Sequence, residues 1–122
     1  MLNFAFTLPI HLCCSPTDMR KNFDGLSSII TTCFNKDPIR DGIFVFVNKQ
    51  RNRMKILIWD RHGYWLLYKR LEAGRFQMPP VDNHSTKEAL QITYEQLMLI
   101  IEGIDLASVK RRKRYSLSNI TA

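Results

Sequence analysis

Two groups of basic residues have the types and spacing needed to bind a polyanion. The first group lies in and beside a predicted pair of strands and consists of Arg51, Arg53, Lys55, Lys69, Arg70 and Arg75. Alternate residues of a strand share a face, so the first three are expected to point the same way, with tyrosine and tryptophan rings nearby for stacking on bases. The second group is a run of five cations near the C-terminal end: Lys110, Arg111, Arg112, Lys113 and Arg114. Such cations suit nucleic-acid phosphates, and a charge run equally suits an acidic protein surface.

Residues for nucleophilic chemistry are present without the required grouping. His11, His62 and His84 are predicted in a lead-in segment, a turn and a loop, with no nucleophile pattern beside them. The three cysteines have neither the spacing of a zinc site nor the even count of a disulfide framework, so they are expected to be reduced and packed as small apolar side chains. The five glycines are scattered and form no phosphate-binding loop.

Four carboxylates, Asp18, Asp24, Asp60 and Glu72, are the candidates for two-metal chemistry of the kind used by nucleases and DDE transposases. Each has a simpler expected role. Asp18 would cap a helix, and Asp24 would pair with Arg20 one helical turn before it. Asp60 would lie in a turn and Glu72 on a sheet edge. We therefore expect a protein that is not an enzyme, with no metal, no other cofactor and no small-molecule substrate.

The elements that must position these residues follow from hydrophobic periodicity. Ser15, Pro16 and Asp18 have the types expected at a helix start, and an apolar stripe with spacings of four and three extends that helix across residues 16–33. Three runs rich in β-branched and aromatic residues, at 43–48, 53–60 and 64–71, predict strands joined by short hairpins. Gly63 is expected to take the positive-φ position in the second turn.

A second helix is predicted over residues 94–102, with Thr93 and Gln96 as a capping box and Gly103 as its C-terminal cap. Residues 9–14 are expected to form a short extended lead-in, and residues 87–92 suit either helix or strand. Together these elements predict a single α+β domain. It would contain a three- to five-stranded antiparallel meander covered on one face by the two helices.

Length and charge divide the chain into a domain and a tail. We expect residues 1–106 to form one globular domain and residues 107–122 to form a flexible basic tail. The net charge is +7, and five of the eighteen Lys and Arg belong to the C-terminal run, which leaves thirteen against eleven Asp and Glu. The folded part is thus only mildly basic. No segment holds the roughly 20 apolar residues of a membrane span, and the N-terminus lacks a basic region, so we expect a cytoplasmic protein without a signal peptide.

Several motifs in this sequence resemble one family. They occur in the order Thr17-Asp18-Met19-Arg20-Lys21, Phe23-Asp24-Gly25-Leu26, Gly42-Ile43-Phe44-Val45-Phe46, Lys55-Ile56-Leu57-Ile58-Trp59-Asp60, Tyr68-Lys69-Arg70-Leu71-Glu72, Gly74-Arg75-Phe76 and Ile101-Glu102-Gly103-Ile104-Asp105. The sequence resembles the TnpB-type accessory proteins, encoded by the second open reading frame, of insertion-sequence family sixty-six. Asn22 and Met78 depart from the family pattern, and Met78 replaces a tryptophan that could stack.

This resemblance implies an accessory role in transposition, with the DDE chemistry carried by a separate transposase. The proteins of this family are distinct from the larger RNA-guided nuclease that shares the TnpB name. The resemblance supplies no catalytic residues. The expected partners are DNA at the insertion-sequence ends, the transposase, or both. Besides the two basic groups, Arg20 and Lys21 are candidate contacts. A protein–protein scaffold without DNA contact and, less favoured, a metal-dependent nuclease are the alternatives.

Overall fold

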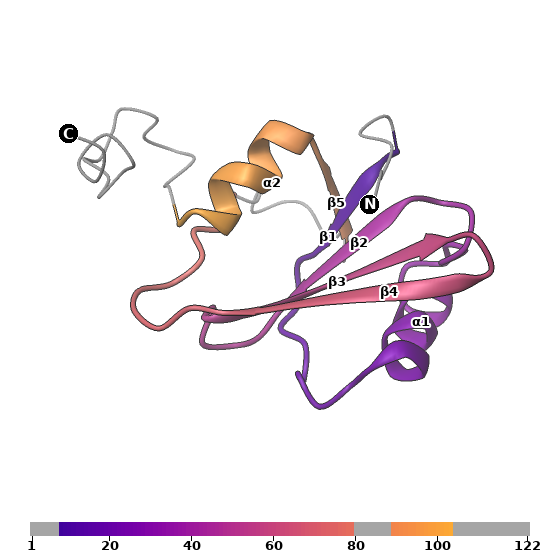
Figure 1. Cartoon of the computed structure of the whole chain (residues 1–122), viewed down its shortest axis with the longest axis horizontal. Helices are drawn as coiled ribbons and strands as arrows, with labels where there is room; N and C mark the ends of the chain where they lie inside the picture. Colours follow the sequence, from indigo (N-terminus) through magenta and orange to yellow (C-terminus); the bar gives the residue numbers. More distant parts are fainter. Residues whose placement is uncertain (1–7, 80–88, 104–122) are drawn as a thin grey trace.

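One mixed β-sheet carries two helices in the described part of this protein (Figure 1). The computed structural model describes residues 8–79 and 89–103 of the 122. The elements along the chain are β1 (Ile10–Cys13), α1 (Phe23–Thr32), β2 (Ile43–Val47), β3 (Arg53–Asp60), β4 (Gly63–Arg70), β5 (Ala89–Ile92) and α2 (Tyr94–Ile101). The strands lie in the order β4-β3-β2-β1-β5, so β4 and β5 form the edges. The predicted α+β class is confirmed.

The strands β2, β3 and β4 form the antiparallel meander that their sequences predict. Their limits agree with the predicted limits to within one residue at each end. The turn between β3 and β4 differs in one respect. Arg61 and His62 take the positive φ values, 45° and 72°, and Gly63 is the first residue of β4. Positive φ at both central positions of a two-residue turn matches the twist of the strands, so the prediction for Gly63 is wrong.

The strand β1 lies inside the sheet, where only an extended lead-in was expected. Ile10 lies opposite Ile43 in a parallel pair with β2 and opposite Ile92 in an antiparallel pair with β5. The sheet is therefore mixed rather than a pure antiparallel meander. A parallel pair needs a crossover connection, and the segment that contains α1 supplies it. Residues 89–92, for which the sequence left helix and strand open, form the edge strand β5.

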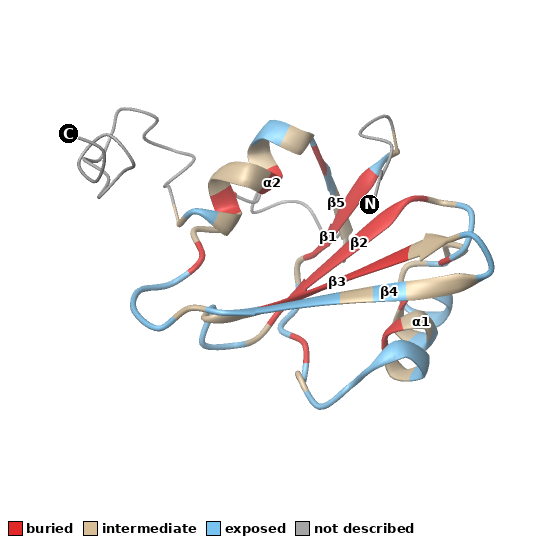
Figure 2. Ribbon diagram, in the orientation of Figure 1, coloured by how far each residue is buried: buried red, intermediate tan, exposed pale blue. Residues whose placement is uncertain are grey.

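The two helices cover opposite faces of the sheet, so the prediction that both cover one face is wrong. Leu26 and Ile30 of α1 pack against Phe44 and Phe46 of β2. On the other face, α2 packs against the odd-numbered residues of the same strand. Since alternate residues of a strand point to opposite faces, every residue of β2 is buried (Figure 2). A continuous apolar run is typical of a strand that is covered on both sides.

The first helix begins later than predicted. Residues 15–22 are not helical, and α1 starts at Phe23 with Asn22 as its N-cap. The backbone N–H of Thr17 donates to the carbonyl of Val47 at 2.9 Å, which holds this segment against the end of β2. Thr17 is buried there. Local helix propensity is a weak preference that tertiary contacts override, and here a long-range hydrogen bond replaces the first predicted turn.

The second helix follows its predicted caps. The side chain of Thr93 accepts from the Gln96 backbone N–H, and the Gln96 side chain accepts from the Thr93 N–H, which completes the capping box. Gly103 has a φ of 76°, as expected for a glycine just past a helix end. Neither helix of the described ranges is long and apolar enough to cross a membrane.

Candidate functional site

Six cations gather at one end of the sheet, around the β2–β3 turn and the end of β4. We call this group the basic end: Lys49, Arg51, Arg53, Lys69, Arg70 and Arg75. Strand register places Arg53 directly opposite Arg70, with Lys69 beside it. The loop after β4 returns to the turn, because the Phe76 N–H donates to the carbonyl of Arg51 at 2.6 Å. The fold thus brings together five of the six cations that the sequence singles out in this region.

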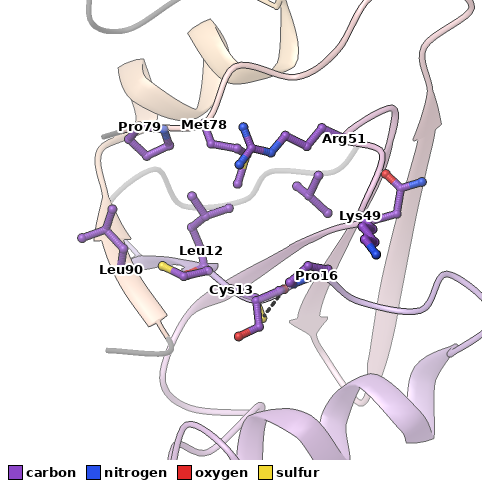
Figure 3. Close-up of a pocket in the computed structure, with 12 residues that line it drawn as sticks. Leu12, Cys13, Pro16, Lys49, Arg51, Met78, Pro79 and Leu90 are labelled. Atoms are coloured by element: carbon purple, nitrogen blue, oxygen red, sulfur yellow. Dashed lines mark hydrogen bonds between the residues drawn. The ribbon is translucent and has the colours of Figure 1, made fainter. Parts of the chain in front are cut away.

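Lys49 is a sixth member that the sequence analysis missed. It is exposed in the β2–β3 turn, next to Arg51 in space, although nothing in its local sequence distinguishes it from other surface lysines. Both side chains border an open pocket of about 610 Å³, which also has apolar lining from Leu12, Met78 and Leu90. Figure 3 shows the Arg51 side chain extending along this pocket toward Met78. Two cations of the basic end thus border a hollow in the surface.

Lys55 does not belong to the predicted contact surface, because its side chain is buried. Lys55 is 3% exposed, and its ammonium donates to the carbonyls of Met19 (2.7 Å) and Lys21 (2.8 Å) and to Oδ1 of Asn22 (2.9 Å). It also lies 4.7 Å from the centre of the Tyr68 ring. An ammonium has three protons to donate, and all three hydrogen bonds here serve the segment before α1. Lys55 positions that segment and is not available to a phosphate.

The expected alignment of Arg51 with Arg53 and Lys55 also fails. Arg53 and Lys55 share the α1 face of β3, where Arg53 donates to the Tyr68 hydroxyl at 3.1 Å. Arg51 precedes the strand and has a φ of 58°, so the strand alternation does not extend to it. The cations of the basic end therefore lie on both faces of the sheet. The surface that they form wraps around its edge.

Arg20 and Lys21 lie in the segment held by Lys55. The Arg20 guanidinium forms an ion pair with Asp18 at 2.7 Å, in place of the predicted pair between Arg20 and Asp24. Asp18 also accepts from the Arg20 backbone N–H at 2.9 Å, so it does not cap the helix. These hydrogen bonds from Arg20 lower the pKa of the Asp18 carboxyl to about 2. Asp18 borders a shallow pocket that Lys49 and Arg53 also line, which places the segment beside the basic end.

The opposite end of the sheet carries a group of carboxylates. Asp37, Asp41 and Asp60 all lie there, at or near the start of β2 and the end of β3. Burial raises the pKa of Tyr64, and the negative charges of Asp37 and Asp24 raise it further. The lysines and arginines at that end number three, Lys36, Arg40 and Arg61, among the described residues. The opposite end thus has carboxylates to balance its cations, whereas cations predominate at the basic end.

The candidate catalytic carboxylates do not converge. Asp18 binds Arg20, Glu72 binds Arg70 at 2.9 Å, and Asp60 accepts from the Trp65 indole N–H at 3.2 Å. Within residues 8–79 and 89–103, no three His, Cys, Asp or Glu side chains are grouped closely enough to hold a metal ion. His11 is buried with its Nε2 2.9 Å from the Asp41 carbonyl oxygen, and its ring stacks on Phe44.

The C-terminal cations and one histidine lie outside the described residues. These are the run at 110–114 and His84. The division into a domain at 1–106 and a tail at 107–122 stays a prediction for the same reason.

Of the cysteines, Cys13 is buried, Cys14 is half-buried and Cys33 is exposed, and all three are free thiols.

Known proteins resemble this chain over most of its length. A family model described as IS66 Orf2 like protein matches residues 8–111. Two proteins of Sinorhizobium fredii (strain NBRC 101917 / NGR234) are similar. The uncharacterized protein y4jC is 34% identical over 105 residues, which cover 86% of this chain and 86% of y4jC. The uncharacterized protein y4hO is 32% identical over 89 residues, which cover 73% of this chain and 74% of y4hO.

No solved structure matches the chain. The family model spans both helices, all five strands and the whole basic end. The match is therefore to the fold unit described above and not to a short motif within it. The chain belongs to the IS66 Orf2-like family, a family of transposition-associated accessory proteins of an insertion sequence.

Proposed function

We propose that this protein binds duplex DNA through the basic end, as a non-catalytic accessory factor in transposition. The observation that carries the proposal is the gathering of six cations at one end of the sheet, where Glu72 is the one carboxylate of the described residues that forms an ion pair with any of them. In the described part of the chain, Arg70 is paired with Glu72, and the other five have no carboxylate within ion-pairing distance. Unpaired surface cations gain most from phosphates, because binding releases the counterions condensed on DNA.

The geometry favours contact with the DNA backbone over the reading of bases. The cations extend around the sheet edge on flexible side chains, and neither helix of the described ranges presents a row of them to a groove. Phosphate contacts position a protein without carrying sequence information. We therefore expect modest preference among duplexes of equal length. The five cations at 110–114 would add to the same electrostatic attraction.

Salt-dependent binding tests this proposal. Fluorescence anisotropy with a labelled insertion-sequence-end duplex, and with a scrambled duplex of equal length, is measured from about 50 to 200 mM salt. Each phosphate contact contributes about −0.9 to the slope of log affinity against log salt. Replacing Arg51, Arg53 and Arg75 by glutamine should make the slope less negative by about 1 per cation. The matched control replaces Lys36, Arg40 and Arg61 at the opposite end and should leave the slope unchanged.

Equal effects of the two triple variants, or an affinity that does not depend on salt, would refute the proposal for this surface. Neutralising the five cations at 110–114 in the full-length chain separates the contribution of that run. Co-purification with the element's transposase, together with no shift of any duplex at low salt, would instead support a protein–protein scaffold. Metal-dependent cleavage of the duplex that Asp18→Asn or Asp60→Asn abolishes would establish a nuclease.

A further inference from the structure

The edge strand β4 is open to a further strand. In the described structure it pairs with β3 on one side, and its other side carries the free backbone groups. β4 is eight residues long, whereas the other edge strand, β5, has four. Proteins usually protect long edges with proline, bulges or charges. β4 has no proline, its pairing with β3 is regular throughout, and its charged residues, Lys69 and Arg70, stand at one end.

The middle of this edge is unusually apolar. Trp65 is 44% exposed, Leu67 38% and Tyr68 50%. These are three of the five exposed large hydrophobic side chains in the described chain, and all three stand within four consecutive positions. Register places Trp65 and Leu67 on the same face as Ile58 and Ile56 of β3. Leu67 also lines a small apolar pocket of about 180 Å³ together with Ile56 and other side chains.

We propose that β4 pairs antiparallel with β4 of a second copy of this chain, about a two-fold axis at Leu66. The Leu71 N–H donates to the Asn52 carbonyl, so the odd-numbered residues of β4 direct their backbone groups toward β3. The even-numbered residues direct theirs outward, because these directions alternate along a strand. A two-fold axis at Leu66 therefore joins outward-pointing groups on both copies. The result is one continuous sheet across the pair.

Side chains are complementary in this register. Tyr64 lies opposite the partner's Tyr68, and Trp65 lies opposite the partner's Leu67. Such aromatic and apolar cross-strand pairs stabilise antiparallel sheets. Each Trp65 also lies beside the apolar pocket next to the partner's Leu67. The residues that are exposed in the single chain thus become the centre of a self-complementary contact, as a two-fold interface requires.

One contact between opposite charges also favours a second copy in this register. Lys69 lies opposite the partner's Gly63, which has no side chain to block it. The partner's Asp60, which is paired with Gly63 across the hairpin, lies on the same face one strand further. A lysine side chain can reach across a glycine to that carboxylate. The basic ends of the two copies lie far apart, since the strands are antiparallel, and do not repel one another. This inference does not rest on the proposed DNA binding.

Sedimentation velocity of the full-length protein under reducing conditions tests the pairing. Two eight-residue strands make an interface at the lower end of the usual sizes, so a monomer–dimer equilibrium is expected between about 1 and 300 μM. Leu67→Lys should weaken the dimer at least about tenfold, because it places charges in the apolar centre. Gln91→Lys is the matched control, since Gln91 is exposed on β5, which forms the opposite edge of the sheet from β4, and it should leave the equilibrium unchanged. A wild-type protein that stays monomeric at the highest concentration, or a Leu67→Lys variant that dimerises normally, would overturn the proposal.

A charge swap tests the register. Lys69→Glu should weaken the dimer, because the new carboxylate would face the partner's Asp60. The double variant Lys69→Glu with Asp60→Lys should recover most of the wild-type affinity. Amide exchange gives an independent reading, since the Leu66 N–H should gain protection with rising concentration and the Leu67 N–H should not. A double variant as weak as the single one, with no concentration-dependent protection at Leu66, would refute this pairing.

Discussion

Replacing Lys55 by methionine removes a buried charge while retaining most of the side-chain volume. The ammonium of Lys55 is the shared donor for the carbonyls of Met19 and Lys21 and for Oδ1 of Asn22. No acid faces it in these contacts, so the variant leaves three oxygens without a donor and no carboxylate without a counter-charge. The change therefore isolates the value of the hydrogen bonds that tie the segment before α1 to β3.

The magnitude follows from those three hydrogen bonds. A hydrogen bond to a charged group contributes about 1.5–3 kcal/mol to the free energy of unfolding. The full sum does not apply, because Lys21 and Asn22 are exposed and water can reach their oxygens once the ammonium is gone. The variant also avoids the cost of burying a charge. We expect a net loss of about 2–4 kcal/mol, a large part of the 5–15 kcal/mol that typically stabilises a domain.

Urea unfolding followed by circular dichroism measures this loss, with Lys49→Met as the control. Lys49 is exposed in the turn between β2 and β3, so its replacement should change the free energy of unfolding by less than about 0.5 kcal/mol. Hydrogen exchange should locate the effect. The Thr17 N–H, which bonds to Val47, and the Leu26 N–H, which bonds to Asn22, should lose protection before the sheet does. A Lys55→Met variant as stable as the control would show that these contacts contribute little.

Three further outcomes are expected. Gly42→Ala should unfold at a clearly lower urea concentration, because Gly42 has a φ of 124° and a Cβ there would lie 2.2 Å from the Pro9 carbonyl oxygen; unchanged stability would contradict this geometry. Proton NMR should show the Asp18 carboxyl titrating near pH 2 rather than 3.8, since the guanidinium two residues along stabilises its charged form. Because the folded pKa is the lower one, the stabilisation is present above about pH 3.8 and is lost as the pH falls through 2. Alkylation of the native protein should label the exposed Cys33 first and Cys13 only on unfolding, because burial raises the pKa of the Cys13 thiol; equal rates would contradict its burial.

Local patterns predicted the parts of this fold that depend on near neighbours. Hairpin-connected strands and a capping box are formed by residues a few positions apart, and both were found where the sequence placed them. The same kind of reasoning predicted the start of α1 wrongly. Ser15 and Pro16 have the residue types of a helix start. However, the segment is held by the Thr17 hydrogen bond to Val47 and by the Lys55 contacts, which come from residues 30 or more positions away. No local window contains such partners.

The apolar residues around Lys55 in the sequence indicate that its side chain is buried, which the alternation of residues along a strand does not show by itself. It is flanked by Met54 and Ile56 and followed by Leu57 on its own face, so a charge stands inside a strand that is apolar on both sides. Such a lysine is buried only when oxygens surround its ammonium. The sequence indicates that those acceptors are needed, but it does not show which segment supplies them.

By itself, the sequence determined the α+β class, the meander of β2 to β4, the second helix and, through its motifs, the family. Only the tertiary structure decided that β1 is an inner strand and that the helices lie on opposite faces. It also decided that Lys49 belongs to the basic end and that Lys55 does not. The physical reason is the range of the interactions. Periodicity records which side chains avoid water, whereas the pairing of strands and the solvation of a single charge depend on contacts between distant parts of the chain.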